Sequence, residues 1–342
     1  MKTIVLEKPE HFKLTSIEDP PAPGPGEALV QVHNVGICGT DISGYLGKMP
    51  FYSYPRIPGH ELGVEVVAVG PDVTAVNPGD RCSVEPYMNC QNCFPCKNGH
   101  SNCCEELAVL GVHIDGGLRP RFLVPARKLH PSDSLTLEQL ALVETLAIGC
   151  HAVNRACLTP TDDVLVIGAG PIGLSVIEFV KLSGARCLVM DLNEARLEFC
   201  RKTMQVADTI AYQGDESDSE KLRDLTQGRL PQVVIDATGN QQSMSNALNY
   251  VAFAGKLIYV GITTQQLQFL HALMHRRELT LLASRNALPG EFKQIIHWIK
   301  ENKIDTQPWI THRIQMEELI DVFPSYTKPE TGVIKAMVSV TE

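Results

Sequence analysis

The sequence has no long run of lysine and arginine, and its 342 residues carry a formal net charge of −9. Nucleic acids and anionic membranes are bound by basic surfaces, so this charge balance argues against both as partners. No predominantly apolar run is long enough to span a membrane. Residues 1–7 have neither the apolar core nor the cleavage site of a secretory signal. We therefore expect a cytoplasmic protein that acts on a small molecule.

The sequence also gives little reason to expect disulfide bonds, although it has 11 cysteines. Disulfide frameworks are typical of short secreted chains, and this chain is long and shows no secretory signal. Five of the cysteines lie between positions 90 and 104, which is the crowding expected of a metal site. The 44% hydrophobic and 20% charged residues otherwise describe an ordinary globular protein, long enough for two domains.

A dinucleotide site is indicated by residues 164–174, Val-Leu-Val-Ile-Gly-Ala-Gly-Pro-Ile-Gly-Leu. Gly168 permits a tight turn from strand to helix, Gly170 lets the backbone approach a pyrophosphate, and Gly173 lets the helix pack closely on the strand. A second strand over 186–190 ends in Asp191, at about the 20-residue spacing expected of the acid that binds the ribose hydroxyls. Arg196 is expected on the next helix, so the acid favours NAD over NADP.

Strands and helices are expected to alternate from residue 161 to residue 282. The pattern predicts strands over 164–167, 186–190, 233–236 and 256–260 with helices between them, which is typical of a doubly wound parallel sheet. Further helices are predicted over 135–152 and 292–302, and a closing strand over 332–340.

A structural zinc site is indicated by Cys90-x-x-Cys93-x-x-Cys96, followed by Cys104. Four thiolates can close a tetrahedral zinc site and stabilise a short loop that has little apolar content. Cys103 is a neighbouring candidate for the fourth ligand, and a redox switch formed by these thiols is the alternative function.

A second metal site is suggested by Cys38 and His60. Cys38 follows the strand predicted over 27–33, and His60 precedes the strand predicted over 64–69. A thiolate and an imidazole from adjacent loops suit a zinc ion that keeps one position open for substrate. A buried cysteine and a capping histidine would explain the same pair. Glu144 lies within an apolar helical stretch, where a carboxylate is costly to bury unless it is paired or bound to metal. The alternative is that Glu144 is a partly exposed residue of this helix.

Four motifs in this order give the chain a resemblance to the zinc-dependent medium-chain dehydrogenase/reductase (alcohol dehydrogenase) family over nearly its whole length. They are Gly36-Ile-Cys-Gly-Thr-Asp41, Gly59-His-Glu61, the four cysteines and residues 166–174. The resemblance implies an α/β protein with a GroES-like β-barrel catalytic domain over 1–153, which includes a zinc lobe over 86–106. A Rossmann domain over 154–288 and a return segment over 289–342 complete the expected architecture.

The resemblance also implies which residues form the sites. The catalytic zinc ligands would be Cys38, His60 and Glu144, and Glu61 would approach the zinc during ligand exchange while Asp41 orients the histidine. The structural zinc ligands would be Cys90, Cys93, Cys96 and Cys104, which leaves Cys103 outside. Two zinc ions and NAD would bind each subunit. The cofactor-binding residues would be Gly168, Gly170, Pro171, Ile172, Gly173 and Asp191.

The reaction implied is metal-assisted transfer of hydride from a carbinol to the nicotinamide, with the Thr40 hydroxyl passing the proton. Two positions depart from the family pattern. Ser43 stands where many members have a relay histidine, which puts the outer proton path in doubt. Val64 stands where a glycine is usual and Gly63 precedes it, which is expected to alter local packing.

Three segments, 54–60, 109–117 and 283–286, look similar to sugar-acid dehydrogenases of the L-galactonate and L-gulonate 5-dehydrogenase type. A carboxylate substrate needs a cationic partner, and the candidates are Arg285, Arg119 and Arg56. Polyol (sorbitol-like) and threonine-type dehydrogenases are the alternatives. A zinc-free quinone reductase is disfavoured by the ligand set and by Asp191, and a non-enzymatic binding protein by the complete catalytic set. Family members are commonly homodimers or homotetramers.

Overall fold

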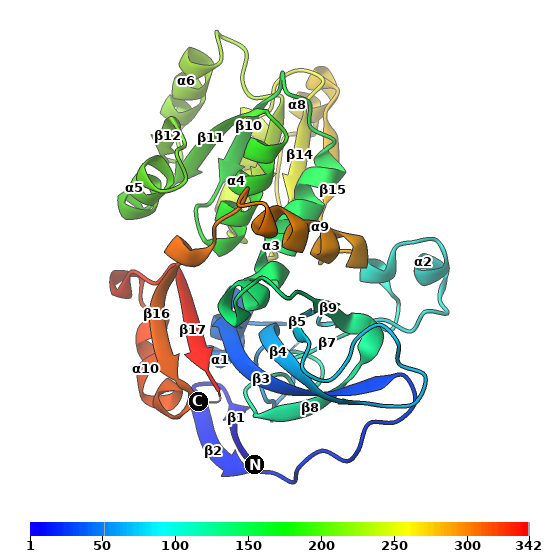
Figure 1. Ribbon diagram of the computed structural model, residues 1–342. Coiled ribbons are helices and arrows are strands. Elements are labelled where there is room, and N and C mark those ends of the chain that lie inside the picture. The colour runs from blue at the N-terminus through cyan, green and yellow to red at the C-terminus, as the bar shows by residue number, and fades with distance from the viewer. Residues whose placement is uncertain (51, 341–342) are drawn as a thin grey trace. The chain divides into compact units, whose positions relative to one another are not determined.

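The computed structural model describes residues 1–50 and 52–340 and divides into two compact units. The first unit comprises residues 1–145 and 288–342, and the second comprises residues 146–287 (Figure 1). The chain therefore leaves the first unit and returns to it. Among the described helices, none combines the length and apolar character needed to cross a bilayer.

The first unit is built on a seven-stranded sheet in the order β16-β17-β3-β4-β5-β9, with β8 paired to β3. Buried and half-buried residues alternate along most of β3, as expected of a strand with one face on a core. The last strand, β17, pairs antiparallel with β3, so the red and dark-blue ribbons lie side by side in Figure 1. The C-terminal segment thus completes the sheet that the N-terminal segment begins.

The strands of the first unit are β1 (Lys2–Lys8), β2 (His11–Ser16), β3 (Glu27–Ile37), β4 (Glu61–Val69), β5 (Arg81–Val84), β6 (Tyr87–Met88), β7 (Ala108–Val109), β8 (Arg121–Pro125), β9 (Leu129–Pro131), β16 (Ile310–Gln315) and β17 (Lys335–Ser339). Its helices are α1 (Gly39–Tyr45), α2 (Phe94–Lys97), α9 (Pro289–Lys300) and α10 (Leu319–Tyr326). Helix α3 (Leu137–Ala156) begins in the first unit and ends in the second.

The second unit is a six-stranded parallel sheet in the order β12-β11-β10-β13-β14-β15, which confirms the predicted doubly wound sheet. The strands are β10 (Asp163–Ile167), β11 (Arg186–Asp191), β12 (Asp208–Ala211), β13 (Val233–Asp236), β14 (Lys256–Tyr259) and β15 (Thr280–Ala283). The helices are α4 (Pro171–Leu182), α5 (Glu194–Lys202), α6 (Glu216–Leu225), α7 (Gln241–Asn246) and α8 (His271–Arg277). The chain order reverses between β10 and β13, and ligands bind at such a switch point beyond the carboxyl ends of the strands.

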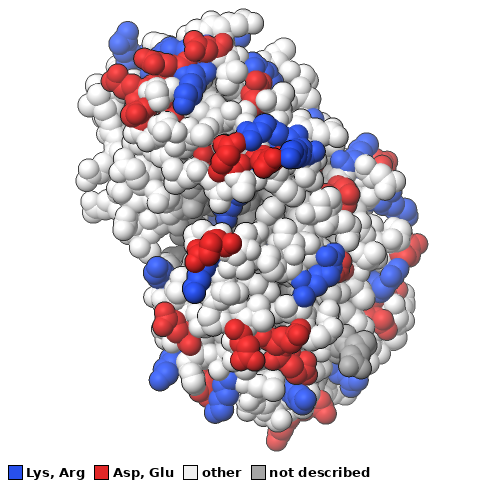
Figure 2. Space-filling model, turned by 90° about the vertical axis from the view of Figure 1, so that its left-hand side faces the viewer, with Lys and Arg blue, Asp and Glu red and all other residues white. Residues whose placement is uncertain are grey.

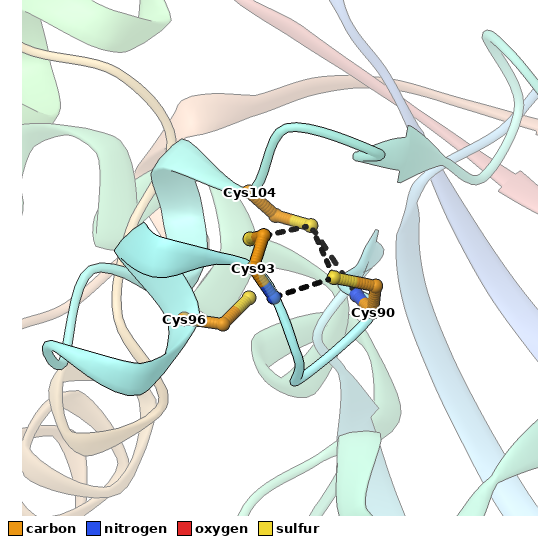
Figure 3. Close-up of side chains that lie close together, drawn as sticks. All are labelled: Cys90, Cys93, Cys96 and Cys104. Carbon is orange, nitrogen blue, oxygen red and sulfur yellow. Dashed lines mark hydrogen bonds between the residues drawn. The ribbon is translucent and has the colours of Figure 1, made fainter.

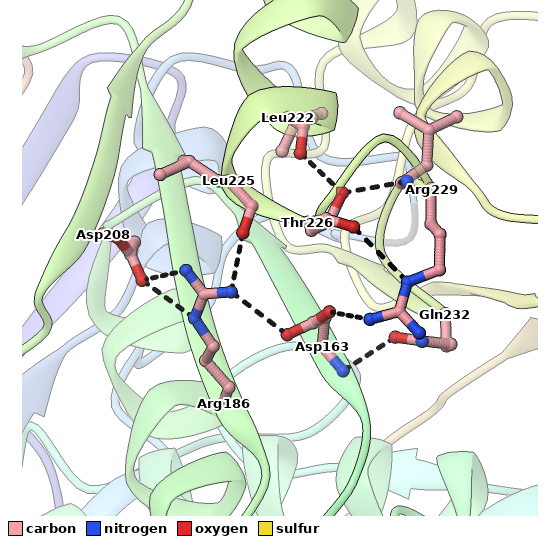
Figure 4. Close-up of polar contacts among 9 residues, drawn as sticks. Asp163, Arg186, Asp208, Leu222, Leu225, Thr226, Arg229 and Gln232 are labelled. Carbon is pink, nitrogen blue, oxygen red and sulfur yellow. Dashed lines mark hydrogen bonds and ion pairs between the residues drawn. The ribbon is translucent and has the colours of Figure 1, made fainter.

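A polar network fixes the opposite, amino-terminal edge of this sheet (Figure 4). Arg186 donates to Oδ2 of Asp208 from Nε at 3.0 Å and from Nη2 at 2.8 Å, and Nη1 donates to the Leu225 carbonyl at 2.7 Å. The Asp163 N–H donates to Oε1 of Gln232 at 2.8 Å. Because these residues lie at the amino ends of the strands, we assign the network to stability.

Gly63, which precedes the departure from the family pattern at Val64, makes a close packing contact. Gly63 lies in β4, and a Cβ atom there would fall 2.0 Å from the carbonyl oxygen of Leu137, the first residue of α3. The pairing of β3 with β4 shifts register between Val32 and Asn34, directly opposite this position. Strand and helix therefore touch through backbone atoms, and this contact fixes the start of the helix that carries Glu144.

We predict that Gly63→Ala lowers the free energy of unfolding by about 2 kcal/mol or more, because the added methyl group must displace backbone rather than a flexible side chain. Urea denaturation measures the change. The matched control is Gly290→Ala in the first turn of α9, where a Cβ meets nothing within 4 Å and stability should be unchanged or slightly higher. Equal unfolding midpoints for Gly63→Ala and the unsubstituted protein would contradict the packing argument.

Candidate active site

Two neighbouring strands bring the first two predicted metal ligands together. β3 ends directly before Cys38, and β4 begins directly after His60. The strands are antiparallel and pair Gly36 with Glu61, so the end of one lies beside the start of the other. Cys38, His60 and Glu61 can consequently offer ligand atoms that all lie within 4.8 Å of one another.

The imidazole of His60 is held beside a buried carboxylate on α1. Oδ2 of Asp41 accepts from the Cys38 N–H at 2.9 Å, and Oδ1 lies 3.7 Å from Nδ1 of His60. Neither Oδ1 nor Nδ1 makes a hydrogen bond with the described residues, although both atoms are buried. Burial disfavours the charged ring, but Asp41 and Cys38 outweigh it and raise the pKa of His60 well above its usual value. The site therefore favours positive charge, and Nδ1 facing Asp41 leaves Nε2 for a cation.

The Glu61 carboxylate forms a buried ion pair with Lys335 on β17. The ammonium donates to both carboxylate oxygens, at 2.6 and 2.7 Å, and to the Ile37 carbonyl at 3.1 Å. A Cβ at Gly36 would fall 2.1 Å from Oε2 of Glu61, so the side chain lies across a position that only glycine can occupy. Sequence analysis did not identify Lys335, because no local motif surrounds it and 274 residues separate it from its partner.

Glu144 reaches the same region from α3 and is only 4% exposed. Burial raises the pKa of Glu144, opposed by the charges of His60 and Lys335. Its carboxylate accepts a hydrogen bond from the Tyr87 hydroxyl. Glu144 does not belong to the set of ligand atoms within 4.8 Å that includes Glu61. Its assignment as the third zinc ligand stays a prediction.

The chemistry of this cluster fits a zinc ion. A thiol, an imidazole and carboxylates are the usual donors to zinc, and Asp41 adds a further buried acid. Against the three buried carboxylates of Asp41, Glu61 and Glu144, the described residues of the cluster set the ammonium of Lys335 and the ring of His60, whose raised pKa favours its charged form. A divalent cation would compensate the excess negative charge. The predicted proton carrier Thr40 lies half-buried in the first turn of α1, and Ser43 follows on the same helix.

The glycine loop of the second unit has the geometry that a dinucleotide requires. Gly168 has φ +95°, and a Cβ at Gly173 would fall 1.7 Å from the Gly168 carbonyl oxygen. Gly170 caps α4, and Pro171 occupies its first position. A Cβ at Gly170 would meet only Nη1 of Arg196, 3.7 Å away, so the backbone is open to a ligand. Pro171 and Ile172 are half-buried in the first turn.

The acid predicted to bind the ribose lies at the end of β11, beside this loop. Oδ2 of Asp191 accepts from the Ala169 N–H at 2.6 Å, and Oδ1 accepts from the Asn193 N–H at 2.7 Å. The carboxylate is therefore fixed by backbone donors and remains half-buried. Arg196 lies on α5, as expected from the sequence.

The four predicted structural ligands converge in the lobe between β6 and β7 (Figure 3). Their sulfur atoms all lie within 4.8 Å of one another, with 3.8 Å between Cys93 and Cys104 and 3.5 Å between Cys104 and Cys90. Sulfur atoms on a tetrahedron around zinc are about 3.8 Å apart for zinc–sulfur bonds of about 2.3 Å. Cys103 is exposed and lies outside this set. The four thiols therefore fit a zinc ion.

Backbone and side-chain donors surround these sulfur atoms. The Cys90 N–H donates to Sγ of Cys104 at 3.2 Å, and the Asn89 amide donates to Sγ of Cys96 at 3.4 Å. The Asn89 bond lowers the pKa of Cys96, whereas burial raises the pKa of Cys104 to about 11. Arg127 donates to the side chain and carbonyl of Asn89 and so ties the lobe to the sheet.

The three arginines proposed for substrate binding differ in what they contact. Arg56 donates to Asp115 at 3.0 Å and to Ser53 at 2.6 Å. Arg119 donates to the carbonyls of Gly116 and Asp115 at 2.9 and 3.0 Å. Arg119 is thus engaged within its own loop, and Arg56 joins two segments that are 59 residues apart in the sequence. Arg285 is exposed and follows β15 in the second unit.

On the face shown in Figure 2, acidic and basic side chains are interspersed. The described residues on this face form no broad basic surface. This agrees with the net charge of −9.

Comparison with known proteins identifies two families along the chain. The alcohol dehydrogenase GroES-like domain matches residues 24–134, and the zinc-binding dehydrogenase domain matches residues 171–301. L-galactonate-5-dehydrogenase of Escherichia coli (strain K12) is 37% identical over 339 residues, which cover 99% of each chain. L-arabinitol 4-dehydrogenase of Aspergillus niger is 32% identical over 335 residues, 93% of this chain and 86% of that one.

A solved structure is similar over nearly the whole chain. It is the alcohol dehydrogenase RspB from E. coli CFT073 complexed with NADH, with a TM-score of 0.91, 28% identity and 99% of each chain covered. These matches confirm the predicted GroES-like and dinucleotide-binding folds.

We predict that Cys93→Ser removes one metal ion per chain and lowers the melting temperature, because the lobe loses a ligand that its short elements need. Metal analysis and calorimetry measure both effects. Cys103→Ser is the matched control and should leave metal content and stability unchanged. A Cys93→Ser protein with full metal content and an unchanged melting temperature would contradict the structural site.

Proposed function

The chain belongs to the zinc-binding alcohol dehydrogenase family, and we propose that it oxidises a secondary hydroxyl of a sugar acid, an aldonate such as L-galactonate or L-gulonate, to the keto acid. The electron acceptor in this proposal is NAD, and each chain holds one catalytic and one structural zinc ion. The proposal rests on one observation above all: a half-buried thiol, a buried imidazole and a buried carboxylate offer ligand atoms that lie within 4.8 Å of one another.

In this function Cys38 and His60 hold the catalytic zinc, together with Glu144 or Glu61. When bound, zinc acts as a Lewis acid that lowers the pKa of a substrate hydroxyl. Asp41 orients the ring of His60. The ammonium of Lys335 neutralises the charge of the Glu61 carboxylate, so that Glu61 and Glu144 can both be buried. The Thr40 hydroxyl, two residues after Cys38, carries the substrate proton away.

The glycine loop and Asp191 bind the cofactor. The open backbone at Gly170 and the free N–H groups at the start of α4 suit a pyrophosphate. The Asp191 carboxylate suits ribose hydroxyls and would repel a 2′-phosphate, which supports NAD over NADP. NAD, when bound, accepts the hydride.

A sugar-acid substrate is supported by two facts. The chain is 37% identical to an L-galactonate-5-dehydrogenase over nearly its full length. Among the three candidate arginines we propose Arg285, which is exposed and follows the carboxyl end of β15, as the cation that receives the substrate carboxylate. The second candidate is oxidation of a neutral polyol, supported by 32% identity to an L-arabinitol 4-dehydrogenase.

We predict that the purified protein reduces NAD, and NADP at least about tenfold more slowly, with L-galactonate or L-gulonate as substrate. Matching neutral polyols should react poorly. Arg285→Ala should raise KM for aldonates by about 10- to 100-fold and leave KM for polyols unchanged, because a lost charge-assisted bond costs about 1.5–3 kcal/mol. Nicotinamide absorbance follows each reaction.

Two results would redirect this proposal. Preference for neutral polyols, with no effect of Arg285→Ala, would move the protein to the polyol dehydrogenases. Cys38→Ser should abolish turnover while NAD binding is retained, and an active Cys38→Ser protein would contradict the catalytic metal site.

We also propose that the protein is a homodimer or homotetramer. β15 is an edge strand of the second unit, and its four residues, Thr-Leu-Leu-Ala, include no charge or proline to block pairing with another chain. The N–H groups of Thr280 and Ser284 point toward β14 and donate to the carbonyls of Gly255 and Tyr259. The N–H groups of Leu281 and Ala283 therefore face outward.

Light scattering should therefore give two or four times the chain mass of 37.6 kDa. Ala283→Pro removes one outward N–H without touching the bonds to β14, and it should shift the protein toward the monomer. A monomeric unsubstituted protein, or an assembly unaffected by this change, would contradict pairing through β15.

A further inference from the structure

The hydroxyl of Tyr87 donates a hydrogen bond to Oε1 of Glu144 in the interior of the first unit. Tyr87 is 2% exposed and Glu144 is 4% exposed. We propose that Tyr87 is a positioning residue that fixes the Glu144 carboxylate at the catalytic metal site. The proposal rests on the catalytic metal site proposed above and adds a residue that no sequence motif identified.

The Glu144 carboxylate needs such a partner. It is buried in a region that already contains Glu61 and the thiol of Cys38, where a further negative charge is costly. Lys335 donates to both oxygens of Glu61, so that ammonium is committed to the other acid. The Tyr87 bond engages Oε1 of Glu144 and leaves Oε2 for a cation. A carboxylate held at one oxygen presents the other in a fixed direction, which is how outer residues orient metal ligands.

The ring of Tyr87 is itself held in place. It packs edge-on against Phe292 of α9 with 6.3 Å between ring centroids, and Phe292 stacks on His130 of β9 at 4.8 Å. Nε2 of His130 lies 3.4 Å from Oε2 of Glu85, and Oε1 of Glu85 accepts a hydrogen bond from the buried Lys128. The hydroxyl therefore projects from a packed layer rather than from a mobile loop, and it can transmit a defined position to Glu144.

A second buried tyrosine makes the same kind of hydrogen bond to a carboxylate outside the metal clusters. Tyr250 is 3% exposed, and its hydroxyl donates to Oδ2 of Asp218 at 3.3 Å within the second unit. Among the described residues, Asp218 belongs to no cluster of metal-binding donors. A buried tyrosine paired with a carboxylate is thus not by itself evidence of function, and the two tyrosines form a matched pair for experiment.

The test compares Tyr87→Phe with Tyr250→Phe in the full-length protein. Each change removes one hydroxyl and keeps the ring. Zinc binding at the catalytic site is measured by competition with a chelator, with Cys38→Ser giving the baseline of the four-cysteine lobe. Cobalt(II) is then substituted and its visible spectrum recorded. Tyr87→Phe should bind zinc about 10- to 100-fold more weakly and shift the cobalt bands, whereas Tyr250→Phe should match the unsubstituted protein in both measurements.

A double-mutant cycle shows whether Tyr87 acts through Glu144. In the Glu144→Gln background, Tyr87→Phe should cause no further loss of zinc affinity, because the ligand it positions is already absent. Full additivity of the two losses would overturn the proposal.

Two other results would also overturn it. One is unchanged zinc affinity and an unchanged cobalt spectrum in Tyr87→Phe. The other is an unfolded Tyr87→Phe protein that has also lost the lobe metal, since the hydroxyl would then serve packing. A different result would show that the proposed function itself is wrong. In that case the Cys38→Ser protein would bind as much metal as the unsubstituted protein, whatever the behaviour of Tyr87→Phe.

Discussion

The antiparallel pairing of β3 with β4 is the constraint on which the metal cluster depends. It sets the residue after β3, Cys38, beside the residue before β4, His60, and it aligns Gly36 with Glu61. β17 then pairs with β3 and brings Lys335 under the Glu61 carboxylate. A slip of one residue in either pairing would turn these side chains to the opposite face of the sheet. The chemistry of the cluster is therefore fixed by the register of backbone hydrogen bonds.

Close contacts at three glycines also position the parts of the site. Gly36 makes room for the Glu61 side chain, Gly63 lets α3 start against β4, and Gly173 lets α4 pack on the turn at Gly168. In each case a Cβ atom would fall within about 2.1 Å of another atom. The glycines of the loop and of the sheet thus serve the same purpose. Because they have no Cβ atom, a neighbouring side chain or helix can approach closely and is held in a defined position.

Charge is balanced differently at the two carboxylates of the cluster. Lys335 donates to both oxygens of Glu61, whereas the hydrogen bond to Glu144 comes from the neutral hydroxyl of Tyr87. A buried acid without a full counter-charge favours a cation. In the proposed function, this difference leaves Glu144 with a greater need than Glu61 for the positive charge of a metal ion.

The sequence by itself determined the features that depend on neighbours in the chain. The turn at Gly168, the acid at Asp191 and the four-cysteine lobe all act over short spacings, and the alternation of strands and helices follows from local hydrophobic patterns. Tertiary structure alone decided that Lys335 pairs with Glu61 across 274 residues and that Tyr87 reaches Glu144 across 57. It also decided that Arg56 pairs with Asp115 across 59 residues. These partners are chosen by strand register and by helix packing, and neither leaves a local pattern at the residues it joins.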